Sequence, residues 1–437
     1  MSEQLLSVGL DVGTTSTQLI FSQLQVENKA GSFSVPEMAI SRRQVLYKSP
    51  IHFTPLLSGD LVDAAALRTI IDTEYQKAGI SKTSVDTGAI IITGETSRKE
   101  NAEAVLHELS GFAGEFVVAT AGPDLESVLA AKGAGADAYS QRTGSTVLHM
   151  DIGGGTSNLA LIRDGKITET GCLNVGGRLL KFDGNRRITY LSPVLTGLTD
   201  LSVGDAVTPE ALAPLAALLT SALEMAAGLR PATALLAQLT TPGTSMTVPA
   251  ESCTLSFSGG VADCISREIP WDAYGDLGPI LGQAIRRSKL CHNFILGEET
   301  IRATVIGAGC HSTQLSGSTV FHQNITFPLK NLPVIPFGQK APEEAHILSL
   351  PEIAFPSYSQ IQKLAQSLTS TGTSPLLICM EQDMAKALGQ TLSLQCPAGM
   401  PILCIDRVRL REGDFLDIAA PIGPALPVVV KTLVLSH

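Results

Sequence analysis

The chain has 437 residues, of which 44% are hydrophobic and 16% are charged, and its formal net charge is −10. This length exceeds one ordinary core, and the composition excludes wholesale disorder, so we expect several globular units. The net negative charge and the lack of a long Lys/Arg block in the sequence argue against nucleic acid as a partner.

The eight cysteines are scattered, and none forms a C-x-x-C pair. This pattern is typical neither of a disulfide framework nor of a zinc site, and it predicts reduced thiols in a cytoplasmic protein. The opening residues, MSEQLLSVGLDVG, lack the basic and apolar regions of a secretory signal. No uninterrupted apolar stretch approaches the ~20 residues that span a bilayer, so we expect a soluble protein.

The first 145 residues alternate between strand and helix patterns and are expected to form a first lobe. Leu5 to Gln25 reads as strand, glycine turn and strand, which predicts a hairpin. Pro123 and Gly133 bracket a short helix near the end of this lobe. The elements predicted between them are a helix over 61–77, a strand over 88–93, a helix over 97–111 and a strand over 115–120.

A second lobe is expected over residues 146–318, because the hairpin pattern returns in LHMDIGGGTSNLALI, Leu148 to Ile162. A further strand pair follows and ends at a double glycine in GCLNVGGRLL. The remaining predicted elements are helices in the Ala/Leu/Pro-rich insert 208–237, a strand running into a double-glycine turn over 253–263, and a small-residue helix opening at 301–317.

Residues 319–437 are expected to form a proline-rich linker and a small C-terminal α/β region. The stretch FPLKNLPVIPFGQKAPEE, 327–344, has the composition of a linker or extended arm. Beyond it, the segments PLLICM, EQDMAKALGQTL, PILCIDRV, FLDIAAPI and VVVKTLVL suggest alternating strands and helix.

Both hairpins break at the same place, where an aspartate precedes glycines and hydroxyl residues: DVGTT at 11–15 and DIGGGT at 151–156. Glycine allows a left-handed backbone and a close ligand approach, so such a turn can present its N–H groups to phosphate. The hydroxyls of Thr14, Thr15, Thr156 and Ser157 can donate to the same oxygens. One copy alone could be an ordinary hairpin with a capping aspartate, but two copies in matching context indicate paired phosphate loops.

An aspartate beside each turn would repel phosphate unless a divalent cation lay between them. We therefore predict that Asp11 and Asp151 anchor Mg²⁺ and take part in the chemistry of a bound phosphate.

These motifs resemble those of the actin/Hsp70/sugar-kinase ATPase superfamily. LDVGTTSTQLI and MDIGGGTSNLALI are similar to its two phosphate motifs, FSGGVAD to its adenosine motif and ATVIGAGCHSTQLSG to its second connecting segment, in the same order. The resemblance implies an α/β fold of two duplicated ribonuclease-H-like lobes that bind ATP with Mg²⁺. It assigns the phosphates to Gly13, Thr14 and Thr15 on one side and to Gly153, Gly154, Gly155 and Thr156 on the other, and the adenosine to Gly259 and Gly260.

Within that superfamily the whole chain resembles the family of ethanolamine ammonia-lyase reactivating factors. The resemblance implies a chaperone-like, slow ATPase that binds a cobalamin-carrying lyase and promotes release of damaged cobalamin, so that intact adenosylcobalamin can rebind. It also implies a cytoplasmic protein, with association with the ethanolamine-utilisation microcompartment and homo-oligomerisation left open. The base-on signature D-x-H-x-x-G is absent from the sequence, so we assign cobalamin to the client.

The residue that orients the attacking water is the open point of the site. Glu126 in GPDLESVLAAKG is the candidate that we assign, with Asp124 and Glu95 as alternatives; each could instead be a helix-terminal or loop acid. Two other functions also stay open at this stage: a small-molecule kinase of the same superfamily and an actin-like polymerising ATPase.

Overall fold

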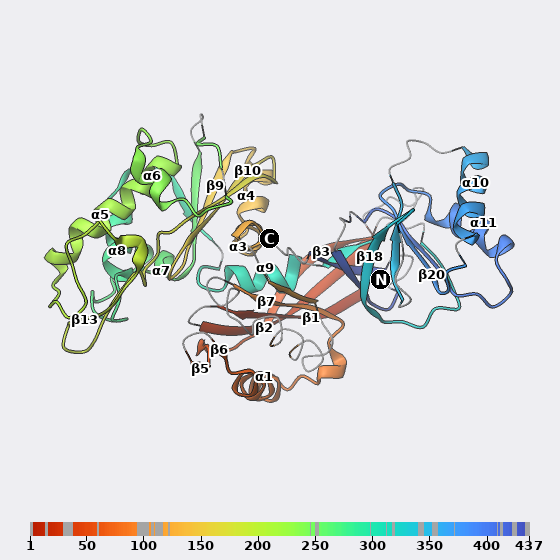
Figure 1. Ribbon diagram of the computed structural model, residues 1–437, viewed down its shortest axis with the longest axis horizontal. Helices are drawn as coiled ribbons and strands as arrows, with labels where there is room; N and C mark the ends of the chain where they lie inside the picture. The colour runs from red at the N-terminus through yellow and green to blue at the C-terminus, as the bar shows by residue number, and fades with distance from the viewer. Residues whose placement is uncertain are drawn as a thin grey trace.

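The fold is given by a computed structural model of the chain. It describes residues 3–13, 16–28, 38–58, 61–93, 105, 109, 117–120, 123–244, 246–249, 253–297, 299–311, 313–316, 320–339, 345–351, 357–370, 372–408, 410, 414–421 and 426–432. Figure 1 shows three α/β units, with the N-terminal sheet below the centre, a second unit on the left and a C-terminal unit on the right.

The N-terminal hairpin forms the centre of a six-stranded sheet of order β3-β2-β1-β7-β8, with β4 paired to β2. β1 is antiparallel to β2 and parallel to β7, and β7 is parallel to β8. The elements of this unit are β1 (Glu3–Val12), β2 (Ser16–Asn28), β3 (Met38–Lys48), β4 (His52–Phe53), β5 (Leu56–Ser58), β6 (Leu61–Val62), α1 (Ala64–Ala78), the 3-10 helix η1 (Lys82–Ser84), β7 (Thr87–Ile92) and β8 (Val117–Thr120).

The second hairpin begins a sheet of the same design, with the order β11-β10-β9-β14-β15. The hairpin strands β9 and β10 are antiparallel, β14 is parallel to β9, and β15 is parallel to β14, as in the first sheet. If the strands of each sheet are numbered along the chain, both sheets have the order 3-2-1-4-5 from edge to edge. This repeated topology confirms the duplicated two-lobed, actin/Hsp70-like architecture.

Helices and short strands around the second sheet complete this unit and its connections. They are α3 (Pro123–Gly133), α4 (Ala136–Thr143), β9 (Val147–Ile152), β10 (Ser157–Arg163), β11 (Lys166–Leu173), β12 (Leu180–Phe182), β13 (Ile188–Leu191), the 3-10 helix η3 (Pro193–Leu195), α5 (Pro209–Ala226), α6 (Ala234–Leu239), β14 (Thr254–Ser258), α7 (Gly260–Ser266), α8 (Gly278–Arg286), the 3-10 helix η4 (Lys289–Cys291), β15 (Phe294–Leu296) and α9 (Ala303–His311).

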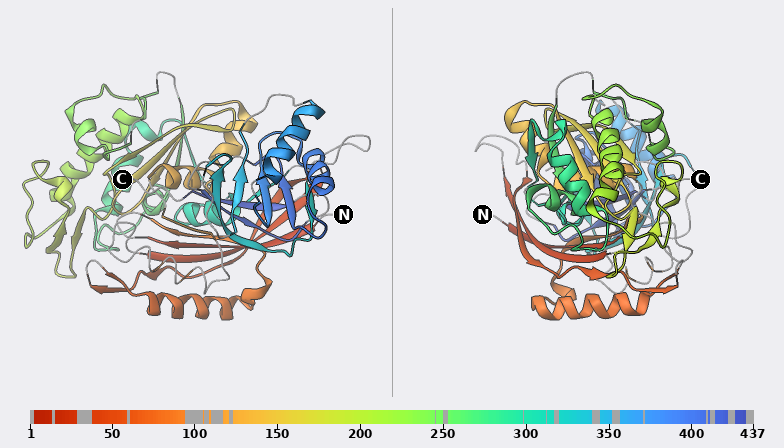
Figure 2. Two further views of the ribbon diagram at one scale, coloured as in Figure 1. Left: turned by 45° about the vertical axis from the view of Figure 1, so that its right-hand side comes forward. Right: turned by 90° about the vertical axis from the view of Figure 1, so that its left-hand side faces the viewer.

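Helix α1 covers one face of the first sheet, as the views in Figure 2 show. The Asp63 side chain caps the start of α1 by accepting a hydrogen bond from the amide of Ala66 at 2.9 Å, and Gly79 ends the helix at a φ of 66°. Leu10 and Leu19 of the hairpin share a buried cluster with Leu67 of this helix. This face of the sheet is therefore an ordinary apolar core.

The opposite face of the first sheet carries Asp11 and packs against α9. Successive side chains alternate between the two faces of a strand, so Asp11 shares its face with Gly9 and not with Leu10. A Cβ on Gly9 would lie 2.4 Å from the carbonyl oxygen of Val305 in α9, which no real side chain tolerates. The absence of a side chain at Gly9 thus lets α9 lie directly on the hairpin.

Helices α3 and α9 cross between the two sheets at backbone distance, in the middle of Figure 1. A Cβ on Gly133 would lie 1.8 Å from the carbonyl oxygen of Ala303, and one on Gly307 would lie 2.0 Å from that of Leu129. Helix α3 also packs on β9, β10 and β11, while α9 packs on β1, β2 and β7. The two lobes are therefore joined by a crossing that only glycine permits.

The C-terminal unit is an eight-stranded sheet of order β16-β23-β22-β18-β19-β20-β21-β17. Strands β18, β19, β20 and β21 are parallel to one another, whereas β18 is antiparallel to β22 and β21 is antiparallel to β17. Helices α10 and α11 pack against each other beside them. Its elements are β16 (Thr313–Leu315), β17 (Phe321–Gln323), β18 (Leu329–Pro336), β19 (Ile347–Ser349), α10 (Tyr358–Thr369), β20 (Leu376–Cys379), α11 (Ala385–Gln395), β21 (Ile402–Ile405), β22 (Asp414–Ile418) and β23 (Pro427–Thr432).

The interpretation of residues 327–344 as a linker is wrong for its central part, because Leu329–Pro336 is strand β18. This strand pairs with β22 up to Pro333 and with β19 from Val334 onward. Pro333 has no N–H to give to a ladder, and it stands where the strand changes partners, so fewer ladder bonds are lost there. A composition that is typical of a linker therefore builds a central strand.

Most other predicted elements are present, with boundaries moved by one to several residues. The predicted helix 61–77 begins at Ala64, after the short strand β6. The helices in the insert 208–237 are α5 and α6, and the C-terminal strands and helix are also present. The predicted helix 97–111 lies almost wholly outside the described residues.

Seven cysteines have side chains that the structure describes, and they are thiols that form no disulfide; Cys172, Cys264, Cys379 and Cys404 are buried. No helix among the described residues is long and apolar enough to cross a membrane.

At the glycine crossing, a substitution that normally stabilises a helix is expected to destabilise the protein. Gly307→Ala would ordinarily stabilise an α-helix, but here its Cβ would meet the carbonyl oxygen of Leu129. We expect the free energy of unfolding to fall by about 2 kcal/mol, from overpacking at the crossing. Chemical denaturation measures this, with Gly184→Ala as the control, because a Cβ on Gly184 meets nothing within 4 Å. Equal stability of both variants would contradict the tight crossing.

Candidate nucleotide site

The two predicted magnesium anchors stand at the ends of equivalent strands. Asp11 closes β1 and Asp151 closes β9, each one residue before the strand ends. Their carboxylates lie close enough that the charge of Asp151 contributes to raising the pKa of Asp11. The fold therefore brings together two acids that are 140 positions apart in the sequence.

Burial raises the pKa of Asp11 to about 7, although a hydrogen bond from the Thr93 hydroxyl, at 2.9 Å, works in the opposite direction. Burial likewise raises the pKa of Asp151 to about 6. Asp151 is 6% exposed, so its charge has little contact with water. A carboxylate that has lost its water favours protonation, or a bound cation that offsets its charge.

Asp151 ends a chain of buried hydrogen bonds that includes a histidine. The Ser258 hydroxyl donates to Oδ1 of Asp151, and Nε2 of His149 lies 2.9 Å from the Ser258 hydroxyl. Because Ser258 gives its one hydrogen to the carboxylate, Nε2 of His149 must donate to it. Nδ1 then accepts from the Ser256 hydroxyl at 3.0 Å, and burial lowers the pKa of His149 to about 3. His149 is thus a neutral support for Asp151.

The glycine turns leave open space beside these aspartates. A Cβ on Gly155 would meet nothing within 4 Å, and one on Gly153 would meet only the carbonyl oxygen of Thr156 at 3.5 Å. The turn itself is held from behind, because the amides of Gly177 and Arg178 donate to the carbonyls of Gly153 and Gly154 at 3.0 and 2.6 Å. The second loop is therefore a fixed turn with an open outer side, as a phosphate cradle requires.

The first turn is fixed in a similar way. The amide of Gly13 donates to the carbonyl of Ser16 at 2.9 Å, and the Thr54 hydroxyl donates to the carbonyl of Gly13 at 2.7 Å. Thr14 and Thr15, which were assigned to the phosphates, lie outside the described residues. Their role stays a prediction.

Two buried amide side chains stand opposite the aspartates across the hairpins. Gln18 pairs with Asp11 and Asn158 with Asp151 in the two antiparallel ladders, so each amide shares the face of its aspartate. Gln18 is 4% exposed and Asn158 is 2% exposed, and neither Oε1 of Gln18 nor Oδ1 of Asn158 has a hydrogen-bond partner among the described residues. Buried acceptors without donors are costly, and they fit a group that brings its own donors.

This donor set fits a hydrated Mg²⁺ with phosphate, since it consists of hard oxygen ligands and leaves room for water and ligand oxygens. The described residues hold no cluster of three or more His, Cys, Asp or Glu side chains that could bind a metal on its own. The protein would therefore hold the ion together with its nucleotide.

The remaining predicted site residues are placed as follows. Gly259 has a φ of 85°, and a Cβ at this position would lie only 2.3 Å from the carbonyl oxygen of Ile152. Glycine therefore lets the second hairpin pack directly against the start of α7. Gly260 opens α7 and faces Ile301. Glu126 is half-buried in the first turn of α3, and Asp124 accepts a hydrogen bond from Thr170 at 2.7 Å. Glu95 lies outside the described residues.

Sequence reasoning did not identify several supports of the site, namely Thr93, Thr54, Ser258 and Arg178. Arg178 follows the double glycine of GCLNVGGRLL, its stem packs on Gly154, and its guanidinium lies 3.4 Å from Asp276. A basic residue directly after that double glycine was the available signal, and it places a positive charge beside the second phosphate loop.

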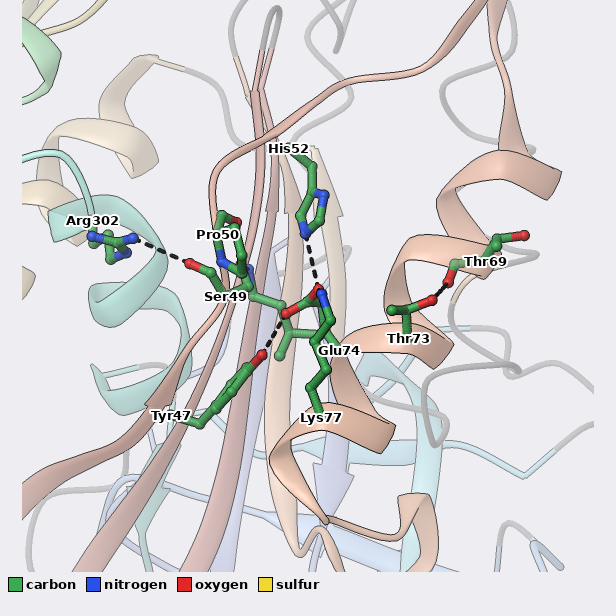
Figure 3. A network of polar contacts seen from close by, with 10 residues as sticks. Tyr47, Ser49, Pro50, His52, Thr69, Thr73, Glu74, Lys77 and Arg302 are labelled. Atoms are coloured by element: carbon green, nitrogen blue, oxygen red, sulfur yellow. Dashed lines mark hydrogen bonds and ion pairs between the residues drawn. The ribbon is translucent and has the colours of Figure 1, made fainter.

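A buried carboxylate, Glu74 of α1, holds β3 and β4 through Tyr47 and His52, and Figure 3 shows its contacts. It accepts hydrogen bonds from the Tyr47 hydroxyl at 2.6 Å and from Lys77 at 2.8 Å, and Nε2 of His52 lies 3.1 Å away. Burial opposes ionisation of Glu74, but these partners hold its pKa below the ordinary value. In the same figure Arg302 donates to the carbonyl of Ser49 at 3.1 Å.

The raised pKa of Asp11 makes the stability of the nucleotide-free protein depend on pH. Its pKa is about 7 in the folded chain against an ordinary 3.8, so the folded state binds a proton that the unfolded state lacks between these values. The free energy of unfolding should therefore fall as pH rises from about 4 to about 7. Asp11→Asn should flatten this fall and raise stability at pH 8 by on the order of 2 kcal/mol.

Denaturation at pH 4 and pH 8 without nucleotide checks this expectation. Asp200→Asn, at an exposed position, is the control and should leave the pH dependence unchanged. A stability that rises between pH 4 and pH 7 equally in the wild type and in Asp11→Asn would show that Asp11 is not desolvated.

Comparison with known proteins finds similarity along nearly the whole chain. The profile of the family described as "Ethanolamine utilisation protein EutA" matches residues 3–353 and 337–436. The chain is 38% identical over 473 residues to the ethanolamine ammonia-lyase reactivase EutA of Salmonella typhimurium (strain LT2), covering 99% of both chains. It is also 38% identical over 463 residues to the protein of that name from Escherichia coli (strain K12), again covering 99% of both.

Among solved structures, an Aquifex aeolicus PPX-GPPA enzyme is 12% identical with a TM-score of 0.44, covering 70% of this chain and 99% of that one. The ethanolamine utilization protein EutJ from Carboxydothermus hydrogenoformans is 20% identical with a TM-score of 0.36, covering 69% of this chain and 88% of that one. The assignment rests on the sequence matches alone, and by them the chain belongs to the EutA family.

Proposed function

We propose that this protein is an ATP-dependent reactivating factor for ethanolamine ammonia-lyase. In this role it promotes release of damaged cobalamin from the lyase, so that intact adenosylcobalamin rebinds. The full-length similarity to two proteins named ethanolamine ammonia-lyase reactivase supports the client. The observation that carries the ATP requirement is the pair of aspartates, half-buried Asp11 and buried Asp151, each beside a glycine turn and each with a pKa raised by desolvation.

Mg²⁺ and ATP are the proposed cofactors, and the ion would neutralise phosphate charge between the lobes. Asp11 and Asp151 would hold the hydrated ion. Gly13, Thr14 and Thr15 would bind phosphate from the first lobe and Gly153, Gly154, Gly155 and Thr156 from the second. Gly259 and Gly260 would adjoin the adenosine, and Glu126 would orient the water for a slow hydrolysis.

The moving parts would be the two lobes, with proposed boundaries at 1–145 and 146–318, and residues 319–437 as the third unit. A nucleotide can drive release of a client only if the ATP and ADP states bind that client with different affinities. The α3–α9 crossing lies between the sheets that carry the two phosphate loops, so a change of lobe angle would turn about it. We place this activity in the cytoplasm.

The direct test mixes the protein with ethanolamine ammonia-lyase inactivated by cyanocobalamin, and follows recovery of lyase activity with free adenosylcobalamin. We expect recovery only with this protein and Mg-ATP together. The same assay with Asp151→Ala should show no recovery, because the ion loses one of its two carboxylates.

Calorimetry of Mg-ATP binding to Asp151→Ala, together with its melting temperature, separates loss of the site from loss of the fold. Full reactivation by a folded Asp151→Ala variant would contradict the assignment of the site. If the wild type binds Mg-ATP but restores no lyase activity, the client is a different protein.

A further inference from the structure

One segment between the lobes makes hydrogen bonds or ion pairs to both of them. This connecting segment, residues 299–302, leads from β15 into α9. Toward the second lobe, the carbonyl of Thr300 accepts from the amide of Gly259 at 3.1 Å and its hydroxyl donates to Asp263 at 2.6 Å. The connecting segment is therefore fixed to the turn proposed for adenosine.

Toward the first lobe, the same segment is held by three contacts. Glu299 forms an ion pair with Lys48, and Arg302 donates to the carbonyl of Ser49 as seen in Figure 3. The third contact is the hydrogen bond from Nε2 of Gln18 to the carbonyl of Ile301, at 3.3 Å. Of the three contacts, this hydrogen bond is the one whose donor lies in the hairpin that carries Asp11.

The chemistry of the Gln18 amide fixes its orientation. A backbone carbonyl can only accept, so the nitrogen of Gln18 must face Ile301 and its oxygen must point away. That oxygen is buried, has no hydrogen-bond partner among the described residues, and belongs to a side chain on the same face as Asp11. One end of the amide thus holds the connecting segment, while the other is a buried acceptor without a donor among the described residues, in a side chain on the sheet face of Asp11.

We propose that Gln18 is a positioning residue that couples occupancy of the nucleotide site to the angle between the lobes. The inference rests on the proposed nucleotide site. When a hydrated ion or phosphate-bound water donates to Oε1, the planar amide is held in the orientation in which Nε2 retains Ile301. The connecting segment, and with it the start of α9, is then fixed to the first hairpin. Without that donor the amide has one weak anchor, and the lobes separate more readily.

Asn158 offers a matched comparison, because it stands opposite Asp151 as Gln18 stands opposite Asp11, and its oxygen is also without a partner among the described residues. Both Gln18→Met and Asn158→Leu keep the approximate volume and remove an amide oxygen beside an aspartate. Only the first also removes the donor to Ile301. The two variants therefore separate loss of ligand contact from loss of coupling.

The experiment uses the full-length protein with Mg²⁺ and the non-hydrolysable analogue adenylyl imidodiphosphate. Calorimetry measures the affinity, and pulsed electron spin resonance measures the distance between spin-labelled residues introduced at Gln76 in α1 and Ala217 in α5, both exposed positions. We expect each variant to weaken binding about tenfold. At saturation, Asn158→Leu should show the ligand-induced distance change of the wild type, and Gln18→Met should not.

Gln18→Asn is the second variant, since its amide is one methylene too short to serve both ends, and it should also lose the distance change. The melting temperature of each variant verifies folding. A saturated, folded Gln18→Met or Gln18→Asn protein that changes distance as the wild type does would overturn the coupling role. So would a wild type that binds the analogue without any distance change. A wild type that binds no magnesium nucleotide would overturn the proposed function itself.

Discussion

The constraint on which this structure depends is the desolvation of two carboxylates, one in each lobe. Asp11 and Asp151 lie at the ends of central strands, and burial raises the pKa of both. Desolvated carboxylates are costly unless they are protonated or share a cation, so a magnesium nucleotide bound as proposed would relieve this cost. The supports around the pair, from Thr93 and from the Ser258–His149 chain, keep both carboxylates in place for that ligand.

The second constraint is the close crossing of α3 and α9. Gly133 and Gly307 let two backbones touch between the sheets, and Gly9 lets α9 lie on the hairpin that ends in Asp11. A packed crossing of this kind moves as a unit, because close-packed interiors do not deform continuously. A change at the phosphate loops can therefore be transmitted to the angle between the lobes, which a chaperone-like activity on a large client would require.

The sequence was sufficient to predict the parts whose signal is local. The repeated aspartate–glycine break located both hairpins and both acids, and periodicity located α1, α5 and the C-terminal strands. It failed at β18, because the proline content of residues 327–344 is typical of linkers, whereas strand pairing that changes partner at Pro333 is a tertiary property. It also missed Thr93 and Ser258, which are single hydroxyl residues at the ends of strands and contact the aspartates only once the sheets form.

Gln18, the proposed coupling residue, also shows the difference between local sequence signals and tertiary contacts. Gln18 has no distinctive signal in the sequence, and its proposed role comes from an amide that donates to the connecting segment and lies on the sheet face of Asp11. The twin positions Gln18 and Asn158 share a place in the repeated hairpin, but only the three-dimensional arrangement gives the first its bond to Ile301. Duplicated motifs thus predict where a site lies, and the contacts between the copies decide how it works.

The most direct test of the paired carboxylates is the number of protons released when preformed Mg-ATP binds. Calorimetry near pH 6.5 in buffers of different ionisation enthalpy measures it, with Asp11→Asn as the reference. Because the pKa of Asp11 is about 7 and that of Asp151 about 6 before binding, the wild type should release more protons than Asp11→Asn, and this excess should vanish by about pH 9. Equal proton release by both proteins at pH 6.5, with Mg-ATP bound, would contradict the account.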